Sequence, residues 1–234
     1  MDSSRKRSTG NHLNIAPPTP RMTDPQTRLV LITGPEAGPD LAERLAAACR
    51  AGDVAAVILR LAPADERSLV KRVKDLAPSA QEAGAAVLVA CDAPGVDPVA
   101  IAARGGADGV HALADEEPGD ALRDLRERLR DGRILGAGTL RSRHAAMEAG
   151  EAGADYVLFG DAEPASRESV RAQAAWWAEI FETPCVAVAR SLDAVAELAA
   201  TGAEFVALDP ALWDGPDAAA TVAAAQERLA GARP

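Results

Sequence analysis

Long apolar runs, cysteine, lysine and aromatic residues are all scarce in this chain of 234 residues. No uninterrupted apolar run approaches the ~18 residues of a membrane-spanning helix, and no apolar stretch follows the first basic residues as in a secretory signal peptide. The three cysteines, Cys49, Cys91 and Cys185, are far apart and odd in number. They therefore suggest neither a disulfide framework nor paired metal ligands. We expect a cytoplasmic protein without a membrane segment.

Positive charge is also in deficit, because the formal net charge is −10. Phosphate backbones and anionic lipids attract basic surfaces, so this deficit argues against binding to nucleic acid or to a membrane surface. Only three lysines occur, Lys6, Lys71 and Lys74, which leaves few candidates for a catalytic lysine. The length suits one sizeable core and is too short for two ordinary α/β domains. One domain is the prediction.

Residues 1–27 are predicted to form a flexible tail. They combine Ser, Thr, Asn and Pro without hydrophobic periodicity, and their basic residues outnumber their acidic ones. A basic tail can serve as an interaction arm. The simpler interpretation, which we prefer, is an upstream extension before an internal start at Met22. The sequence leaves a start at Met1 or Met22 open.

Short apolar segments alternate with helical patterns from residue 28 onward. The apolar segments are continuous, as in strands covered on both faces. Strands are expected at Leu29–Thr33, Val54–Arg60, Ala85–Ala90, Gly109–His111, Ile134–Thr139, Tyr156–Gly160, Cys185–Ala189 and Phe205–Asp209. Helices are expected between them, including Asp40–Arg50, Asp120–Arg130, Arg167–Phe181, Leu192–Ala200 and Asp217–Leu229. The glycines expected to end helices in the left-handed conformation are Gly52, Gly84, Gly106, Gly153 and Gly202.

A short motif recurs at Gly106–Val110, Gly153–Val157 and Gly202–Val206, at spacings of 47 and 49 residues. This period is too long for one strand–helix unit and suits two, so every second strand shares the motif. Eight strands alternating with helices over ~200 residues predict a (β/α)8 TIM barrel formed by residues 28–234 as a single domain. A doubly wound open sheet is the alternative, although no Gly-x-Gly-x-x-Gly follows the first strand.

The carboxyl ends of barrel strands carry the chemistry of such folds. The residues at these ends are Thr33, Arg60, Cys91, Asp92, His111, Thr139, Gly160, Asp161, Ala189, Arg190 and Asp209. Cys91 could be a nucleophile, but His111 belongs to the next strand and His144 to a helix, so a buried apolar role is preferred. The expected role of the aromatic residues is core packing or a subunit interface, and a subunit interface would imply a homo-oligomer. These residues are Trp176, Trp177, Phe181 and Trp213.

The ordered motifs resemble those of the thiamine phosphate synthase family, which includes the thiazole tautomerases. Residues 29–35, LVLITGP, are similar to the first-strand motif LYLITDP of that family. Residues 107–111, ADGVH, match its ADGVH, and residues 153–160, GADYVLFG, are similar to GADYIGFG. Order and spacing agree over roughly Leu29 to Trp213. The resemblance implies an enzyme that couples hydroxymethylpyrimidine diphosphate to a thiazole phosphate and releases pyrophosphate with the help of Mg²⁺.

The diphosphate and metal positions of the family are partly retained. Its QLREK motif corresponds to residues 58–62, where Arg60 is kept but Ile58 and Ala62 replace the glutamine and the lysine. Its ND pair corresponds to Cys91 and Asp92, so the metal carboxylate is kept and the amide is lost. The second metal ligand corresponds to Glu116, with Asp115 beside it. Carboxylates with phosphate oxygens commonly hold Mg²⁺.

The remaining loops depart further from the family. Its STH motif keeps only Thr139, and Leu140 replaces the histidine, which weakens a tautomerase interpretation. In the acidic loop after the sixth strand, only Ser166 and Arg167 suit phosphate. Arg190 replaces part of the family's GGI and could offer a bidentate contact to phosphate. The eighth strand ends in Asp209 and Pro210, where the carboxylate would repel phosphate and proline removes a donor.

The resemblance thus implies catalytic roles for Arg60 and Thr139. The side chains expected to contact a small phosphorylated pyrimidine or thiazole are Arg60, Cys91, His111, Thr139, Ser166, Arg167 and Arg190. Mg²⁺ is expected on Asp92 with Glu116 or Asp115. These residues also have purely structural interpretations. Arg60 could pair with a carboxylate such as Asp92 or Asp209, and His111 could be buried in the fold. The metal carboxylates could be solvated without binding an ion, and Arg190 could lie in a surface loop that has diverged in sequence.

Two hypotheses about function remain open. The first is a diverged thiamine phosphate synthase-like protein that retains ligand binding, with weak or lost synthase activity. The second is a non-catalytic barrel that senses a ligand or binds a partner protein. Whether the chain is an enzyme therefore stays open, since fold alone does not determine function.

Overall fold

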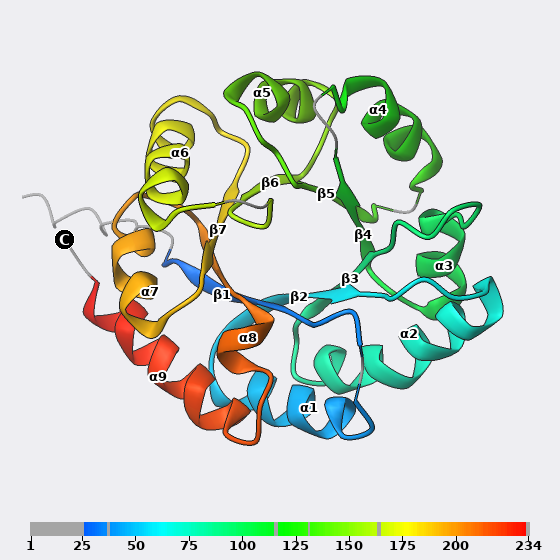
Figure 1. Ribbon diagram of the computed structural model, residues 1–234, viewed down its shortest axis with the longest axis horizontal. Helices are drawn as coiled ribbons and strands as arrows, with labels where there is room; N and C mark the ends of the chain where they lie inside the picture. Colours follow the sequence, from blue (N-terminus) through cyan, green and yellow to red (C-terminus); the bar gives the residue numbers. More distant parts are fainter. Residues whose placement is uncertain (1–25, 37, 115–116, 131, 163–164, 233–234) are drawn as a thin grey trace, which may run out of the picture.

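A closed barrel of parallel strands is the centre of the computed structural model, which describes residues 26–36, 38–114, 117–130, 132–162 and 165–232 (Figure 1). The strands are β1 (Arg28–Ile32), β2 (Val54–Arg60), β3 (Ala86–Ala90), β4 (Gly109–Leu113), β5 (Ile134–Gly138), β6 (Tyr156–Phe159), β7 (Cys185–Ala189) and β8 (Phe205–Leu208). Each strand pairs with the next, and β8 pairs with β1. The predicted (β/α)8 barrel is confirmed, because the pairing of β8 with β1 closes the sheet and leaves no edge strand.

An outer ring of helices covers the barrel (Figure 1). The helices are α1 (Leu41–Ala51), α2 (Glu66–Gln81), α3 (Pro98–Gly105), α4 (Gly119–Arg128), α5 (Arg143–Glu151), α6 (Arg167–Ile180), α7 (Leu192–Ala199), α8 (Pro210–Trp213) and α9 (Ala218–Gly231). The strand and helix limits agree with the predicted ones to within two residues. Among the described residues, no helix is both long and apolar enough to cross a bilayer.

Two apolar layers lie on the two faces of the strands. One fills the barrel interior and consists of Val30, Ile32, Ile58, Leu88, Ala90, Tyr156, Leu158, Val186, Val188 and Ala207. The other lies between the strands and the helices and includes Leu29, Leu31, Val57 and Leu59. Because successive strand residues point to opposite faces, both faces must be apolar. This explains the continuous apolar runs in the sequence.

Four of the five glycines predicted to end helices have positive φ values. These are Gly84 (87°), Gly106 (83°), Gly153 (90°) and Gly202 (91°). The prediction is wrong for Gly52, whose φ of −156° is extended. A Cβ atom at Gly52 would lie 3.1 Å from Val222 Cγ1, so close packing against α9 is the feature that suits glycine there.

Two large aromatic residues pack within the core and satisfy their polar atoms. Trp177 on α6 is buried and donates from Nε1 to the Thr183 carbonyl at 2.6 Å. Trp213 on α8 is buried and donates to the Ile32 carbonyl at 2.8 Å, which ties α8 to the end of β1. Buried indole rings ordinarily have such a partner. The packing role predicted for these aromatics is confirmed for these two.

The predicted tail, residues 1–27, lies outside the described residues apart from Gln26 and Thr27. Thr27 Oγ1 donates to the Ala203 carbonyl at 3.0 Å. This bond attaches the chain to the barrel just before β1 begins, at the end of the barrel opposite the carboxyl ends of the strands.

Candidate active site at the carboxyl ends of the strands

Arg60, the last residue of β2, extends its side chain over the end of the barrel. Its backbone N–H donates to Thr33 Oγ1 at 3.1 Å, which joins the ends of β1 and β2. Its guanidinium Nη2 lies 3.7 Å from Asp161 Oδ2, and 28% of the side chain is exposed. Within the described residues, the buried Nε atom has no hydrogen-bond partner. The Arg60 side chain is therefore partly exposed at this end of the barrel, although its Nε atom is buried.

The carboxylate beside Arg60 is not one of those suggested from the sequence. Pairing with a carboxylate such as Asp92 or Asp209 was the alternative to a diphosphate-binding role, and the structure places Asp161 beside Arg60. Asp161 follows β6, which lies across the barrel from β2 in the strand order. Side chains at the ends of opposite strands can contact each other across a narrow barrel. The order of residues along the chain does not show such a contact directly.

Asp161 is the most buried charged side chain at this end of the described barrel. Only 1% of the side chain is exposed. Its Oδ1 accepts a hydrogen bond from the Thr139 N–H at 2.8 Å. Its Oδ2 lies 3.7 Å from both Arg60 Nη2 and His111 Nε2 and has no hydrogen-bond partner within the described part of the chain. Sequence reasoning placed Asp161 at a strand end but assigned it no role.

His111 in β4 connects Asp161 to the barrel interior. The side chain is 1% exposed, and Nδ1 lies 2.7 Å from the Tyr156 hydroxyl. Burial, with help from the charges of Asp161 and Asp155, raises the pKa of Tyr156, so this hydroxyl keeps its proton. An Nε2 lone pair would face the Asp161 carboxylate and be repelled. Electrostatics therefore favours the tautomer in which Tyr156 donates to Nδ1 and Nε2–H points toward Asp161.

Thr139 follows β5 with a φ of +55°, a left-handed conformation that is an outlier for a β-branched residue. Its N–H bonds to Asp161, and its hydroxyl donates to the Ala114 carbonyl and, at 2.8 Å, to the Gly138 carbonyl. These contacts connect the loops after β4, β5 and β6. Backbone strain of this kind persists where surrounding contacts over-determine it, and it is common at functional sites.

Gly138 provides the space that this cluster occupies. A Cβ atom there would come within 2.4 Å of His111 Nε2 and 2.5 Å of Asp161 Oδ2. We expect Gly138→Ala to lower the free energy of unfolding by about 1–3 kcal/mol through overpacking, measured by urea denaturation. Gly34→Ala is the matched control, because its added Cβ meets nothing within 4 Å. Equal stability losses in the two variants would contradict this assignment.

A cavity of about 160 Å³ opens beside the ends of β6 and β7, between α6 and α7. Gly160, Arg167, Arg190 and Ser191 provide its polar lining. It thus brings together the two arginines that the sequence proposed for phosphate. Ser166 does not line it and instead caps α6, where its hydroxyl accepts from the Ser169 N–H at 3.1 Å.

Both arginines already contact carboxylates. Arg190 donates from Nη2 to the Gly160 carbonyl at 3.2 Å, and its Nε lies 3.6 Å from Asp209 Oδ2. Arg167 pairs with Glu197 on α7. Asp209 also caps α8 by accepting from the Ala211 N–H at 2.9 Å. In the structure Asp209 is therefore the counterion of Arg190.

The expected metal site is only partly described. Cys91 is partly buried and Asp92 is exposed in the loop after β3. Asp115 and Glu116 lie outside the described residues. Within the described ranges, no group of three or more His, Cys, Asp or Glu side chains could hold a metal ion. The Mg²⁺ assignment stays a prediction.

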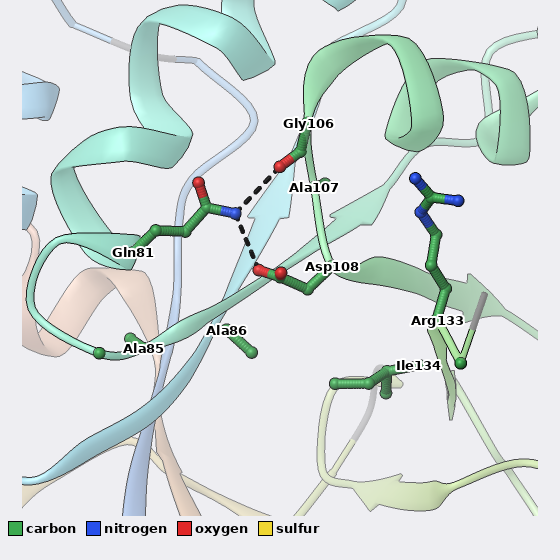
Figure 2. A pocket seen from close by; sticks show the side chains of 10 residues that line it. Gln81, Ala85, Ala86, Gly106, Ala107, Asp108, Arg133 and Ile134 are labelled. Carbon is green, nitrogen blue, oxygen red and sulfur yellow. Dashed lines mark hydrogen bonds between the residues drawn. The ribbon is translucent and has the colours of Figure 1, made fainter.

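A larger cavity, of about 680 Å³, lies at the opposite end of the barrel, at the amino ends of β3, β4 and β5. Figure 2 shows Gln81 there, donating from its amide to the Gly106 carbonyl and to the Asp108 carboxylate, each at 2.9 Å. Arg133 also lines this cavity. None of the residues proposed for ligand or metal belongs to this lining.

The fold and the charged cluster define a (β/α)8 barrel whose candidate ligand site lies at the carboxyl ends of its strands, as is general for enzymes of this fold. A family model, thiamine monophosphate synthase, matches residues 29–212. The chain belongs to the thiamine monophosphate synthase family, which confirms the resemblance inferred from the motifs.

Similar proteins agree with this placement. The thiamine-phosphate synthase of Rhodospirillum centenum is 37% identical over 215 residues, which cover 89% of this chain and 99% of that protein. That of Hyphomonas neptunium is 37% identical over 210 residues, covering 83% and 91%. A solved thiamine phosphate pyrophosphorylase from Pyrococcus furiosus superposes with a TM-score of 0.71 at 24% identity, covering 90% of this chain and 98% of that one. The last likeness concerns the fold.

Proposed function

We propose that this chain binds a phosphorylated pyrimidine or thiazole at the carboxyl ends of its strands and that its thiamine phosphate synthase activity is weak or lost. Membership of the family and the names of its relatives support the choice of ligand. The observation that carries the proposal is the Arg60–Asp161 pair. The arginine side chain that would bind diphosphate is partly exposed, yet a buried carboxylate 3.7 Å from its guanidinium already opposes its charge.

The loss of a second cation supports reduced catalysis. Departure of a diphosphate leaves negative charge that preorganised cations must stabilise. Ala62 occupies the lysine position of the family motif. The nearest lysines in sequence, Lys71 and Lys74, lie on the outer helix α2, where Lys71 pairs with Asp75 at 2.6 Å. Neither replaces the missing charge.

The cavity between α6 and α7 is the proposed site for a thiazole phosphate. Arg167 and Arg190 could each offer two N–H donors to phosphate oxygens. Ser191 is the N-cap of α7, and the N–H groups of a helix start add further attraction for an anion. The Glu197 and Asp209 carboxylates compete for the same guanidinium groups, which supports moderate rather than tight binding.

Mg²⁺ remains part of the proposal. Asp92, with Asp115 or Glu116, would hold the ion together with phosphate oxygens. When bound, it would supply positive charge to the diphosphate. Asp92 is exposed and therefore accessible to such an ion.

A turnover and binding experiment tests the proposed function. Purified protein, Mg²⁺, hydroxymethylpyrimidine diphosphate and thiazole phosphate would be assayed for thiamine phosphate, and each ligand would be titrated alone by calorimetry. We expect little or no product, binding of at least one ligand, and about tenfold weaker binding of the diphosphate in Arg60→Ala where the wild type binds it. Arg123→Ala on α4 is the matched control, because Arg123 is exposed and pairs only locally with Asp120 at 2.7 Å.

The outcomes separate the hypotheses. Rapid turnover would contradict the weak-activity proposal, and product that is unchanged in Arg60→Ala would remove Arg60 from the site. Ligand binding with little or no turnover is the outcome that supports the proposal. If neither ligand binds, the proposal is wrong, and a partner-binding role becomes the hypothesis to pursue.

A further inference from the structure

The buried carboxylate of Asp161 lies beside Arg60, the arginine that the family resemblance assigns to diphosphate binding. Asp161 is 1% exposed, and its Oδ2 is 3.7 Å from Arg60 Nη2. This oxygen has no hydrogen-bond partner among the described groups, although it is buried. A buried charge without full hydrogen bonding is costly, so the position calls for a reason beyond stability.

The carboxylate is also held in place. The Thr139 N–H binds Oδ1 at 2.8 Å, and Thr139 keeps its positive φ in doing so. Gly138 lacks the side chain that would displace Asp161. An arriving anion therefore meets a fixed negative charge rather than one that rotates away.

This arrangement acts differently on ligands of different charge. Arg60 and Asp161 together carry no net charge, and His111 adds charge only when protonated. A single phosphoryl group can approach the partly exposed Arg60 side chain. A diphosphate brings more negative charge to the same place, and the Coulomb repulsion from Asp161 grows with that charge. Discrimination between ligands often depends on such a repulsive element.

We propose that Asp161 is a specificity-determining residue, which opposes the charge of Arg60 and so selects a singly phosphorylated ligand over a diphosphate. This inference rests on the proposed function for the identity of the ligand. It deepens that function by naming the charge class that the barrel end accepts. It also assigns the cause of weak synthase activity to a particular residue rather than only to the missing lysine.

The affinities of inorganic phosphate and pyrophosphate test the proposal. Calorimetric titrations without Mg²⁺ would compare the wild type, Asp161→Asn and Asp161→Asn with Arg60→Gln. We expect Asp161→Asn to bind pyrophosphate about tenfold more tightly, with a smaller gain for phosphate, because one repulsive charge is removed. The added Arg60→Gln substitution should remove the gain. Asp124→Asn on the exposed face of α4 controls for net charge.

Asparagine keeps an oxygen for the Thr139 N–H, so Asp161→Asn is expected to fold. If its circular dichroism differs from the wild type, Asp161→Ser, which also retains an acceptor, takes its place. A pyrophosphate affinity within about twofold of the wild type, or an equal gain in Asp124→Asn, would overturn the proposal. A gain that persists after Arg60→Gln would overturn it too.

The two proposals can fail separately. If the wild type binds no pyrimidine or thiazole phosphate but Asp161→Asn gains pyrophosphate affinity through Arg60, the proposed function is wrong and the charge selection stands. If the wild type binds thiazole phosphate but the variant gains nothing for pyrophosphate, the proposed function stands and Asp161 has no selective role.

Discussion

Replacing Asp108 by alanine is expected to lower the free energy of unfolding by about 2–3 kcal/mol. Asp108 precedes β4, and its Oδ2 accepts a hydrogen bond from the Val87 N–H at 2.7 Å. The same oxygen accepts from the Gln81 amide at 2.9 Å (Figure 2). Its own N–H donates to the Val87 carbonyl at 2.7 Å. Alanine would leave the N–H of the buried strand residue Val87 without an acceptor. Loss of a charged acceptor from a buried N–H donor costs about 2–3 kcal/mol of stability.

Urea denaturation of Asp108→Ala, Asp108→Asn and Asp124→Ala would measure this effect. Asparagine can place its oxygen where Oδ2 lies, so we expect it to recover at least half of the loss. Asp124 is on the exposed side of α4 and should change stability by less than about 0.5 kcal/mol. If Asp108→Ala is as stable as Asp124→Ala, the bond to Val87 contributes nothing to the fold.

The same contact explains the motif that recurs every second strand. Asp155 before β6 accepts from the Leu135 N–H of β5 at 2.8 Å, and Glu204 before β8 accepts from the Cys185 N–H of β7 at 2.9 Å. In each case an acidic residue before an even-numbered strand binds the N–H of the preceding strand. The repeat in the sequence was therefore sufficient to predict the paired-strand period, although its hydrogen bonds became apparent only in the structure.

The strands were predictable because both of their faces are buried, which demands continuous apolar residues. Val54–Arg60 and Cys185–Ala189 begin and end as predicted. Helix ends at glycine were predictable where φ is positive and not at Gly52, because close packing against Val222 leaves no trace in the local sequence. The local pattern thus determines the elements, and contacts between distant segments determine the exceptions.

The candidate site was less predictable than the barrel. Strand-end positions identified Arg60, His111, Thr139 and Asp161 as residues at one end of the barrel. Their pairing depends on which side chains turn inward and on the loop conformation at Thr139, and neither follows from residue type. The knowledge that β2 and β6 are opposite in an eight-stranded barrel could have suggested Asp161 as a partner of Arg60.

Alkaline pH is expected to destabilise the fold strongly, chiefly through two buried thiols. Burial, together with the Glu204 charge, raises the pKa of Cys185 from 9.0 to about 12, and burial raises the pKa of Cys49 to about 11. In the unfolded chain both thiols ionise near the ordinary value. Between these limits the unfolded state binds fewer protons than the folded state, so stability falls as pH rises.

The magnitude follows from the size of each shift. One pKa unit corresponds to about 1.4 kcal/mol, and both unfolded thiols are already half ionised near pH 9, so Cys185 and Cys49 each remove about 2 kcal/mol between about pH 9 and about pH 11. Tyr156 adds to the loss above about pH 10, because its pKa is also raised by burial and its unfolded hydroxyl ionises there. The contributions are fully present below about pH 9, where all three groups are protonated in both states.

Urea denaturation under reducing conditions at several pH values would measure this slope. Cys185→Ala should lose less stability between about pH 9 and about pH 11 than the wild type does, by about 2 kcal/mol, even where its stability at neutral pH is lower. Cys91→Ala is the matched control, because it also removes one thiol but at a partly exposed position. A parallel decline in the wild type and in Cys185→Ala would show that the Cys185 thiol ionises equally easily in both states. The loss of stability would then have to come from other groups. Water would also have to reach the Cys185 thiol between β7 and α6, although this side chain is buried in the structure.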